Sequence, residues 1–356
     1  RALPPVGWLA LAPGRAPPRE WPGAVPTVAG VTPQRAAGAG SPKRPAGAGR
    51  AAPWKAAGAM DDSAALPDFS DSDFFLSSEH VSLGQKIGEG QFSTVHVGVY
   101  FGDVVAVKKQ TRQGKNLEKY LLRELAVLKY IEHENLLEYI GAWNEVSAVA
   151  DILNAVYIVT EFAQGGDLLS LLLSENQLGW RFRVGIARGA ASALEYLHSS
   201  NLIHRDVKAS NILLDSEWRC KLSDFGMARE VTARMTICGT DEYMAPELFF
   251  DEDYGTAVDM FSFGMVLLEI LTCRKVGEDG FAERKPARKF MLDADATRAA
   301  LPDDAPGSLV ELTMQLCDYE EGNRPTAQTA HEWLPPPPLA RPPPGAPAAA
   351  AGLGHK

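Results

Sequence analysis

Along this 356-residue chain the spacing of the apolar residues changes from a pattern mainly typical of strands to one mainly typical of helices. Residues 81–109 hold three short β-branched runs that are separated by glycine-containing turns. After the glycine pair at 165–166, the apolar runs at 181–198 and 258–271 have the length and spacing of helices. The chain is therefore predicted to be an α+β protein with a small antiparallel sheet lobe and a larger, mainly helical lobe.

The same patterns place the single elements. A helix near residues 116–132 interrupts the strands of the first lobe, with Leu128 and Ile131 on its apolar face. The predicted lobes are residues 81–162 and 163–334, the predicted strands are 81–87, 94–100, 104–109, 136–143 and 155–160, and the predicted helices are 116–132, 181–198, 258–271, 308–316 and 326–334.

Both ends of the chain differ in composition from the part between them. Residues 1–59 are rich in Ala, Pro, Gly and Arg and show no apolar periodicity, so we expect a disordered tail, with an organelle transit peptide as the alternative. Residues 60–80 are expected to form an acidic linker, and Met60 is a candidate for the true first residue. Residues 335–356 are again rich in proline and are expected to be disordered.

Charge and cysteine spacing narrow the class of protein. The formal net charge is −10, although residues 1–59 carry eight Lys and Arg and one acid, so the remainder is strongly acidic and nucleic acid is not an expected partner. The four cysteines are widely spaced, which favours a reducing compartment, and we expect a cytoplasmic location, with the nucleus as an addition. No apolar run approaches the roughly 20 residues that cross a bilayer, so no membrane span is expected.

A glycine-rich turn joins the first two predicted strands. Residues 88–95 read GEGQFSTV, and the glycines at 88 and 90 allow backbone amides to close over phosphate oxygens. A plain tight turn is the commoner explanation of such a pattern, and Ser93 stands where a third glycine is usual. The turn therefore indicates a phosphate site only together with its neighbours.

Lys108 ends the third predicted strand, where the sequence reads VAVK. A lysine inside an apolar strand needs either an exposed edge or an anionic partner. With about 100° per residue on the following helix, Glu124 falls in the middle of the apolar stripe, whereas Glu118 falls at its margin. Because a carboxylate that faces the core needs a cation, we expect Lys108 to pair with Glu124.

The octet HRDVKASN, residues 204–211, places six polar or charged residues between two apolar runs. Burying so many polar groups costs free energy unless they act together. With this octet, the chain carries five motifs in order, namely the glycine loop at 88–95, VAVK at 105–108, HRDVKASN at 204–211, DFG at 224–226 and APE at 245–247. The same motifs occur in this order in eukaryotic protein kinases, which the chain therefore resembles over about residues 83–334.

The resemblance implies the two-lobed protein kinase fold, ATP and Mg2+ as cofactors, and protein substrates. Asp206 would orient and deprotonate the substrate hydroxyl, and Lys208 would stabilise the transferring phosphoryl group. Asn211 and Asp224 would hold two magnesium ions, and Lys108 would contact the α and β phosphates. These residues, with Glu124 as the partner of Lys108, are the predicted catalytic and metal-binding set.

The resemblance also implies where ATP lies. Adenine would be placed between the sheet and Leu213, with hydrogen bonds to the backbone of two residues that follow a Thr160 gatekeeper. The ATP-binding residues implied in this way are Ile87, Gly88, Glu89, Gly90, Gln91, Phe92, Ser93, Thr94, Val95, Ala106, Lys108, Thr160, Glu161, Ala163 and Leu213.

Two further residue sets take structural roles from the same resemblance. Asp259 resembles the residue that anchors the catalytic loop, and Glu247 with Arg324 resembles the buried ion pair that fixes the substrate platform. Lys208 and Thr240 are typical of kinases that act on serine or threonine, and a dual-specificity kinase is the alternative. The stretch from Leu301 to Pro325 resembles the tyrosine-kinase-like group of serine/threonine kinases.

A switch is predicted in the activation segment, residues 224–247. The sequence offers Arg205 no obvious carboxylate partner, and Thr236 lies four residues before Thr240, where many kinases that resemble this chain carry an activating phosphate. A phosphate on Thr236 would form charge-assisted hydrogen bonds with Arg205 and order the segment. A hydroxyl that only satisfies a backbone group is the alternative.

Two rival functions are set against catalysis. The first is a pseudokinase scaffold that binds nucleotide without transferring phosphate, which the complete set of catalytic residues argues against. The second is an adaptor: residues 341–347 read RPPPGAP, a match to a polyproline ligand for an SH3-type partner. Such matches arise easily in a proline-rich tail, so the match carries little weight, and an SH3-type partner would come in addition to catalysis rather than in its place.

Overall fold

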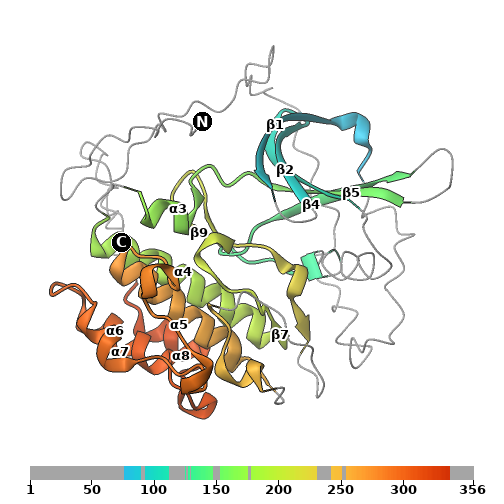
Figure 1. Ribbon diagram of the computed structural model, residues 1–356. Coiled ribbons are helices and arrows are strands. Elements are labelled where there is room, and N and C mark those ends of the chain that lie inside the picture. Colours follow the sequence, from blue (N-terminus) through green and yellow to red (C-terminus); the bar gives the residue numbers. More distant parts are fainter. Residues whose placement is uncertain are drawn as a thin grey trace, which may run out of the picture.

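The computed structural model describes most of the region between the two predicted tails (Figure 1). The predicted tail at residues 1–59, residues 60–75 of the predicted linker and residues 337–356 of the second tail lie outside the described residues. The described residues are 76–89, 93–111, 125, 127–128, 130–146, 153–174, 178–230, 242–250 and 254–336.

The first lobe is built on one antiparallel sheet with the strand order β1-β2-β3-β5-β4 (Figure 1). Its outer core is formed by Val105 and Val107 of β3 packing with Trp143 and Tyr157, whose rings stack with their centroids 4.4 Å apart. Alternate residues of a strand point to opposite faces, so the residues between these valines face the other side of the sheet. The strands are β1 (Val81–Glu89), β2 (Ser93–Tyr100), β3 (Asp103–Thr111), β4 (Tyr139–Val146) and β5 (Leu153–Glu161).

The fourth strand starts three residues later than predicted. Leu136 forms an isolated bridge with Leu222 of the second lobe, and the backbone N–H of Leu137 donates to Leu222 O at 2.9 Å. The apolar character of this stretch was therefore a sign of contact with the helical lobe rather than of the sheet. The predicted helix at 116–132 is helical at its described residues up to Tyr130, and Leu128 and Ile131 are buried as expected.

The second lobe is mainly helical, which confirms the predicted α+β, two-lobed architecture (Figure 1). Every residue from Val258 to Leu271 is buried, because α5 is apolar on almost all sides and runs through the centre of the lobe. The α-helices of this lobe are α3 (Leu168–Leu172), α4 (Trp180–Ser199), α5 (Ala257–Thr272), α6 (Ala294–Ala299), α7 (Gly307–Leu316) and α8 (Ala327–Trp333). None of the described helices combines the length and apolar character needed to cross a membrane.

The short helices α3 and α6 were missed because five or six residues are too few to show a period. Their N-caps carried the available signal. The carboxylate of Asp167 accepts from the backbone N–H of Ser170 at 2.8 Å, and that of Asp293 accepts from Ala296 at 3.1 Å.

Strands of two small sheets flank the loop that carries the octet and precede Asp224. The octet 204–211 lies between β7 and β8, and Asp224 follows β9. The strands are β6 (Gly166–Asp167), β8 (Ile212–Leu214) and β9 (Cys220–Leu222) in one sheet, and β7 (Leu202–Ile203) and β10 (Arg229–Glu230) in the other. Short 3-10 helices are η2 (Ser78–His80), η3 (Ala209–Asn211), η4 (Phe225–Met227), η5 (Pro246–Phe249), η6 (Glu278–Gly280), η7 (Pro286–Arg288) and η8 (Glu321–Asn323).

Candidate active site

The loop that carries the octet is held by one buried carboxylate. The backbone N–H groups of His204 and Arg205 donate to the two oxygens of Asp259, each at 2.8 Å, and His198 Nε2 lies 2.9 Å from the same carboxylate. Burial acts to raise the pKa of Asp259, but the hydrogen bond and charge of His198 hold it below its usual range. Arg205 has φ 66°, a left-handed conformation that costs about 1–3 kcal/mol and that the Asp259 contacts stabilise. The predicted anchoring contact is confirmed.

Asp206, Lys208 and Asn211 come together within this loop. Lys208 Nζ lies 2.8 Å from Asp206 Oδ2, and Asn211 Nδ2 donates to the same oxygen at 2.9 Å. Asn211 Nδ2 also donates to the backbone carbonyl of Asp206 at 2.8 Å. Two donors therefore fix the orientation of the Asp206 carboxylate, as a residue that must aim at a reacting hydroxyl requires.

Lys108 and Asp224 join the two lobes. Lys108 Nζ on β3 lies 3.1 Å from Asp224 Oδ1, which follows β9. The ammonium of Lys108 holds the pKa of Asp224 below its usual range, and the charge of Lys208 acts in the same direction. The predicted partner Glu124 lies outside the described residues, and the sequence reasoning had assigned Asp224 to metal binding without foreseeing this ion pair.

The site offers donors that suit a hard cation. Asn211 turns Nδ2 toward Asp206, which leaves Oδ1 on the other side of the side-chain amide. The backbone N–H and the hydroxyl of Ser223 donate to the backbone carbonyl of Asn211 at 2.9 and 2.8 Å and so hold this residue in place. The Asp224 carboxylate supplies further oxygens. Among the described residues no group of three or more His, Cys, Asp and Glu could hold a metal ion. Two protein oxygens supplemented by phosphate oxygens are the mode in which Mg2+ is usually bound, so these residues fit that ion.

The predicted adenine-binding residues lie on the strands that border the other lobe. Ala106 of β3 is in register with Thr160 of β5, and Val95 of β2 is in register with Lys108. Leu213 lies on β8 in the second lobe, and like Val95 and Ala106 it is half-buried, so part of each side chain is accessible. In the glycine loop, Gly90, Gln91 and Phe92 lie outside the described residues, whereas residues 87–89 and 93–95 belong to β1 and β2.

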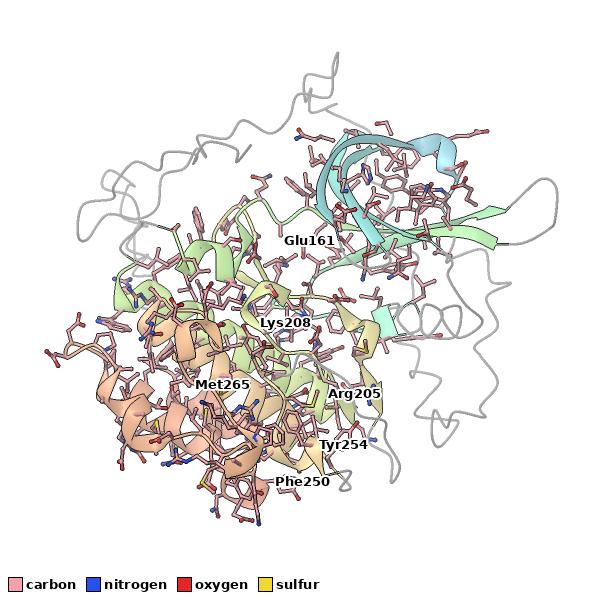
Figure 2. The ribbon with its side chains drawn as sticks, viewed as in Figure 1. Glu161, Arg205, Lys208, Phe250, Tyr254 and Met265 are labelled. Atoms are coloured by element: carbon pink, nitrogen blue, oxygen red, sulfur yellow. The ribbon has the colours of Figure 1, made fainter. Side chains whose placement is uncertain are left out.

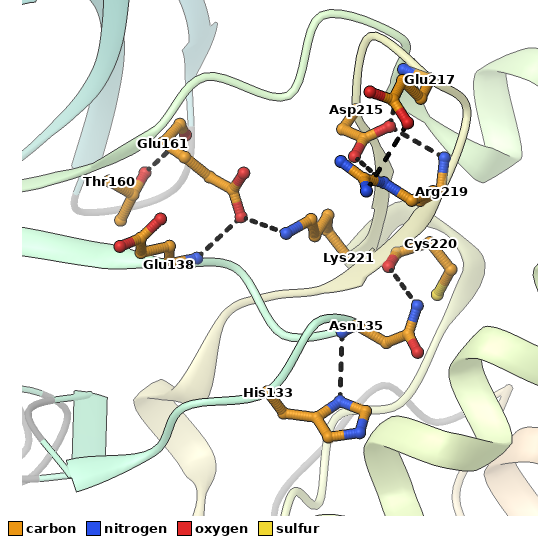
Figure 3. A network of polar contacts seen from close by, with 10 residues as sticks. All are labelled: His133, Asn135, Glu138, Thr160, Glu161, Asp215, Glu217, Arg219, Cys220 and Lys221. Carbon is orange, nitrogen blue, oxygen red and sulfur yellow. Dashed lines mark hydrogen bonds and ion pairs between the residues drawn. The ribbon is translucent and has the colours of Figure 1, made fainter. Parts of the chain in front are cut away.

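The end of β5 is held by a network that the sequence did not reveal (Figure 3). Glu161 Oε1 accepts from the backbone N–H of Glu138 at 2.9 Å and lies 2.8 Å from Lys221 Nζ of β9. The Thr160 hydroxyl donates to the Glu161 carbonyl at 3.2 Å. Figure 2 shows Glu161 beside the sheet lobe and Lys208 toward the helical lobe. A lysine in the apolar strand β9 was the available signal for this contact, by the argument already applied to Lys108.

Arg205, the predicted regulatory residue, is buried and contacts neutral oxygens. Its Nε donates to the Met227 carbonyl at 2.8 Å and its Nη1 donates to the Tyr254 hydroxyl at 2.9 Å (Figure 2). Thr236, its predicted phosphorylated partner, lies outside the described residues, so the switch stays a prediction.

The segment that contains the APE motif is held by a buried ion pair with Arg324. Arg324 pairs with Glu247 through two hydrogen bonds of 2.6 and 2.8 Å, and its side chain is fully buried. Its remaining donors reach the carbonyls of Asp318, Ala257 and Tyr319, so the buried charge is compensated. The predicted ion pair of Glu247 and Arg324 is confirmed.

Glu269 of α5 is buried and contacts Tyr243 at the start of the same segment. The Tyr243 hydroxyl and the Val276 backbone N–H donate to its Oε1 at 2.8 and 3.1 Å, whereas its Oε2 has no hydrogen-bond partner among the described residues. Burial raises the pKa of Glu269 to about 7. The carboxyl group therefore gains or loses its proton near neutral pH.

This raised pKa predicts that the protein loses stability as the pH rises from about 4.5 through about 7. The folded protein binds the proton more tightly than the unfolded chain, so the stabilisation is fully present below the ordinary pKa of 4.5 and is lost as the pH rises through about 7. Between about pH 6 and about pH 8 the loss amounts to roughly 1 kcal/mol. Thermal unfolding of the wild type and of Glu269→Gln at both pH values measures it, with Glu278→Gln at an exposed position as control. An equal pH dependence in the wild type and Glu269→Gln would contradict the prediction.

Comparison with known proteins agrees with this geometry. Residues 81–334 match a family model described as the protein kinase domain. A Dictyostelium discoideum protein named as a probable serine/threonine-protein kinase is 36% identical over 266 residues, which cover 71% of this chain and 61% of the relative. Another from the same organism, the probable serine/threonine-protein kinase kinX, is 37% identical over 288 residues, 78% of this chain and 25% of the relative. The chain thus spans less than two thirds of the length of these relatives.

Proposed function

Because the chain belongs to the protein kinase family, we propose that it transfers the γ-phosphate of ATP to serine and threonine hydroxyls of protein substrates. The observation that carries the proposal is the convergence of Asp206, Lys208 and Asn211 from one loop with Asp224 and Lys108 at the junction of the lobes. Each of these groups carries a charge or dipole that phosphoryl transfer requires.

Asp206 is the proposed base. Its carboxylate, oriented by Asn211 and Lys208, accepts the proton of the substrate hydroxyl as the hydroxyl oxygen forms a bond to the γ-phosphorus. The bond between that phosphorus and the oxygen bridging to the β-phosphate breaks, and ADP leaves with the electron pair. Lys208 lies next to the carboxylate and stabilises the negative charge of the group in transfer.

Lys108 and the metal-binding pair act on the phosphates. Lys108 projects from β3 to the place where Asp224 enters the site, which suits an ammonium that positions the α and β phosphates. Asn211 and Asp224 are the residues that would hold Mg2+, which when bound neutralises phosphate charge. The backbone of Glu161 and Ala163 would bind adenine, with Thr160 as gatekeeper.

The preference for serine and threonine is supported by the names of the relatives and by Lys208. Thr240, the other residue typical of this preference, lies outside the described residues. Assignment to the tyrosine-kinase-like group, the Thr236 switch and an SH3-type partner for residues 341–347 remain part of the proposal. Deleting residues 335–356 should leave kinase activity intact, which would separate the last of these from catalysis.

The acceptor preference can be tested directly with peptides. The chain is incubated with magnesium and ATP labelled at the γ-phosphate, and with three peptide libraries that differ only in a central Ser, Thr or Tyr. We expect label on the Ser and Thr libraries and background on the Tyr library. Label on all three would indicate a dual-specificity kinase instead, and no transfer to any library would refute the proposed activity.

A further inference from the structure

The loop between α5 and α6 contacts the start of the segment formed by residues 242–250. Arg284 Nη2 in this loop donates to the backbone carbonyl of Glu242 at 3.1 Å. Gly277 of the same loop has φ +80°, and a Cβ atom placed on it would lie 2.7 Å from Cγ of Glu242. The loop therefore holds Glu242 by its backbone and by the stem of its side chain.

Arg284 is also held in place by aromatic rings. Its guanidinium carbon lies 4.8 Å from the ring centroid of Phe261 on α5 and 5.9 Å from that of Phe249, and its Nη1 donates to the Phe290 carbonyl at 3.5 Å. Burial lowers the pKa of Arg284 to about 10, which still leaves it cationic at neutral pH. A planar guanidinium can stack on rings by its faces and donate to two carbonyls from different nitrogens at its edges, a geometry that a lysine ammonium, with all its donors on one nitrogen, does not reproduce.

The far end of the segment meets the same loop. The rings of Phe249 and Phe290 stack with their centroids 3.8 Å apart, and the exposed Phe250 lies at the lower edge of the lobe (Figure 2). Between the two ends, the Tyr243 carbonyl accepts from the Ser262 hydroxyl at 2.8 Å, and Glu247 pairs with Arg324. The interior of the segment is thus fixed to α5 and to the end of the lobe, while its first described residue depends on the loop.

The segment lies beside the proposed base. On α5, Asp259 accepts from the backbone N–H groups of His204 and Arg205, next to Asp206, and Ser262, one helical turn later, donates to the Tyr243 carbonyl at 2.8 Å, so neighbouring turns of one helix hold both the loop of Asp206 and the segment. A substrate whose hydroxyl reaches Asp206 must therefore pass close to this segment. The nucleotide, in contrast, would be held by the strands of the first lobe and by residues 206–224, none of which has a contact with Arg284 among the interactions described above.

We propose that Arg284 is a positioning residue for the protein substrate, which acts by fixing Glu242 at the entrance of the segment 242–250. The inference rests on the proposed function, because it concerns the acceptor peptide of the same reaction. Losing the contact leaves Glu242 free to move and misplaces the peptide relative to Asp206. The effect falls on peptide binding and spares ATP binding.

The test compares Arg284→Met with Arg284→Lys and with Arg288→Met as a matched control. Arg288 lies in the same loop, but its side chain is 65% exposed and pairs with the exposed Asp293. In Arg284→Met we expect the KM for the acceptor peptide to rise roughly 10-fold, the effect of losing one hydrogen bond to a charged donor, with kcat and the KM for ATP within about twofold. Arg284→Lys should recover only part of the loss, and Arg288→Met should match the wild type.

A second variant approaches Glu242 from the other side. Gly277→Ala places a methyl group against the Glu242 stem without touching the guanidinium, and it should also raise the KM for the peptide. It decides the question if Arg284→Met does not fold. An unchanged peptide KM in folded Arg284→Met, or in Gly277→Ala when the first variant is unfolded, overturns the proposal. Equal rises of the KM for the peptide and the KM for ATP overturn it as well, because they indicate general destabilisation. If the wild type transfers no phosphate, the proposed function itself fails and this proposal fails with it.

Discussion

Asp206→Asn is expected to lower the rate of phosphate transfer by roughly 10²-fold or more while the protein stays folded. The amide has the shape of the carboxylate and can still accept a hydrogen bond from Asn211 or Lys208, which now meet at Oδ2. It has no basic oxygen for the proton of the substrate hydroxyl. The Asp259 contacts to His204 and Arg205 are independent of this side chain, so the loop should keep its shape.

Initial rates of peptide phosphorylation at saturating ATP measure the effect. Asp303→Asn, a change of the same kind at an exposed position of the second lobe, serves as control and should match the wild type. The affinity for ADP should change little, because ADP lacks the group that is transferred. A rate near that of the wild type in Asp206→Asn would show that Asp206 is not the base.

Lys108→Met is expected to lower turnover on the order of 10²-fold or more with a smaller loss of ATP affinity. The methionine chain fills the space of the lysine stem, so the core formed by the neighbouring Val107 should remain intact. Asp224 loses the ammonium 3.1 Å away that now lowers its pKa. The phosphates lose the cation that places them, which affects the transfer step more than binding.

The control for this variant lies one residue further along β3. Lys109 points to the opposite face, where its Nζ lies 3.7 Å from Glu145 and 5.1 Å from the ring centroid of Tyr157. Lys109→Met makes the same chemical change on the same strand and should leave turnover close to that of the wild type. Comparable turnover in Lys108→Met and the wild type would mean that the strand register had been misread.

Local patterns in the sequence were sufficient for the features that depend on neighbouring residues. The octet 204–211 brings Asp206, Lys208 and Asn211 together because they lie within six residues of one another and β7 and β8 enclose the loop. The apolar period of α5 likewise predicted a central buried helix to within one residue at each end. Such features follow from backbone geometry, which is the same in every fold.

The tertiary structure decided which distant groups meet. The ammonium of Lys108 lies next to Asp224, 116 residues away, whereas the sequence suggested only the nearby Glu124. Lys221 reaches Glu161, and Arg284 reaches Glu242, although nothing in the spacing of either pair marks it. A charged residue within an apolar run of the sequence indicates a buried charge that needs a partner, because leaving such a charge unpaired costs several kcal/mol or more. Which partner it finds depends on how the lobes and loops pack, and packing is a property of the whole fold rather than of any window of sequence.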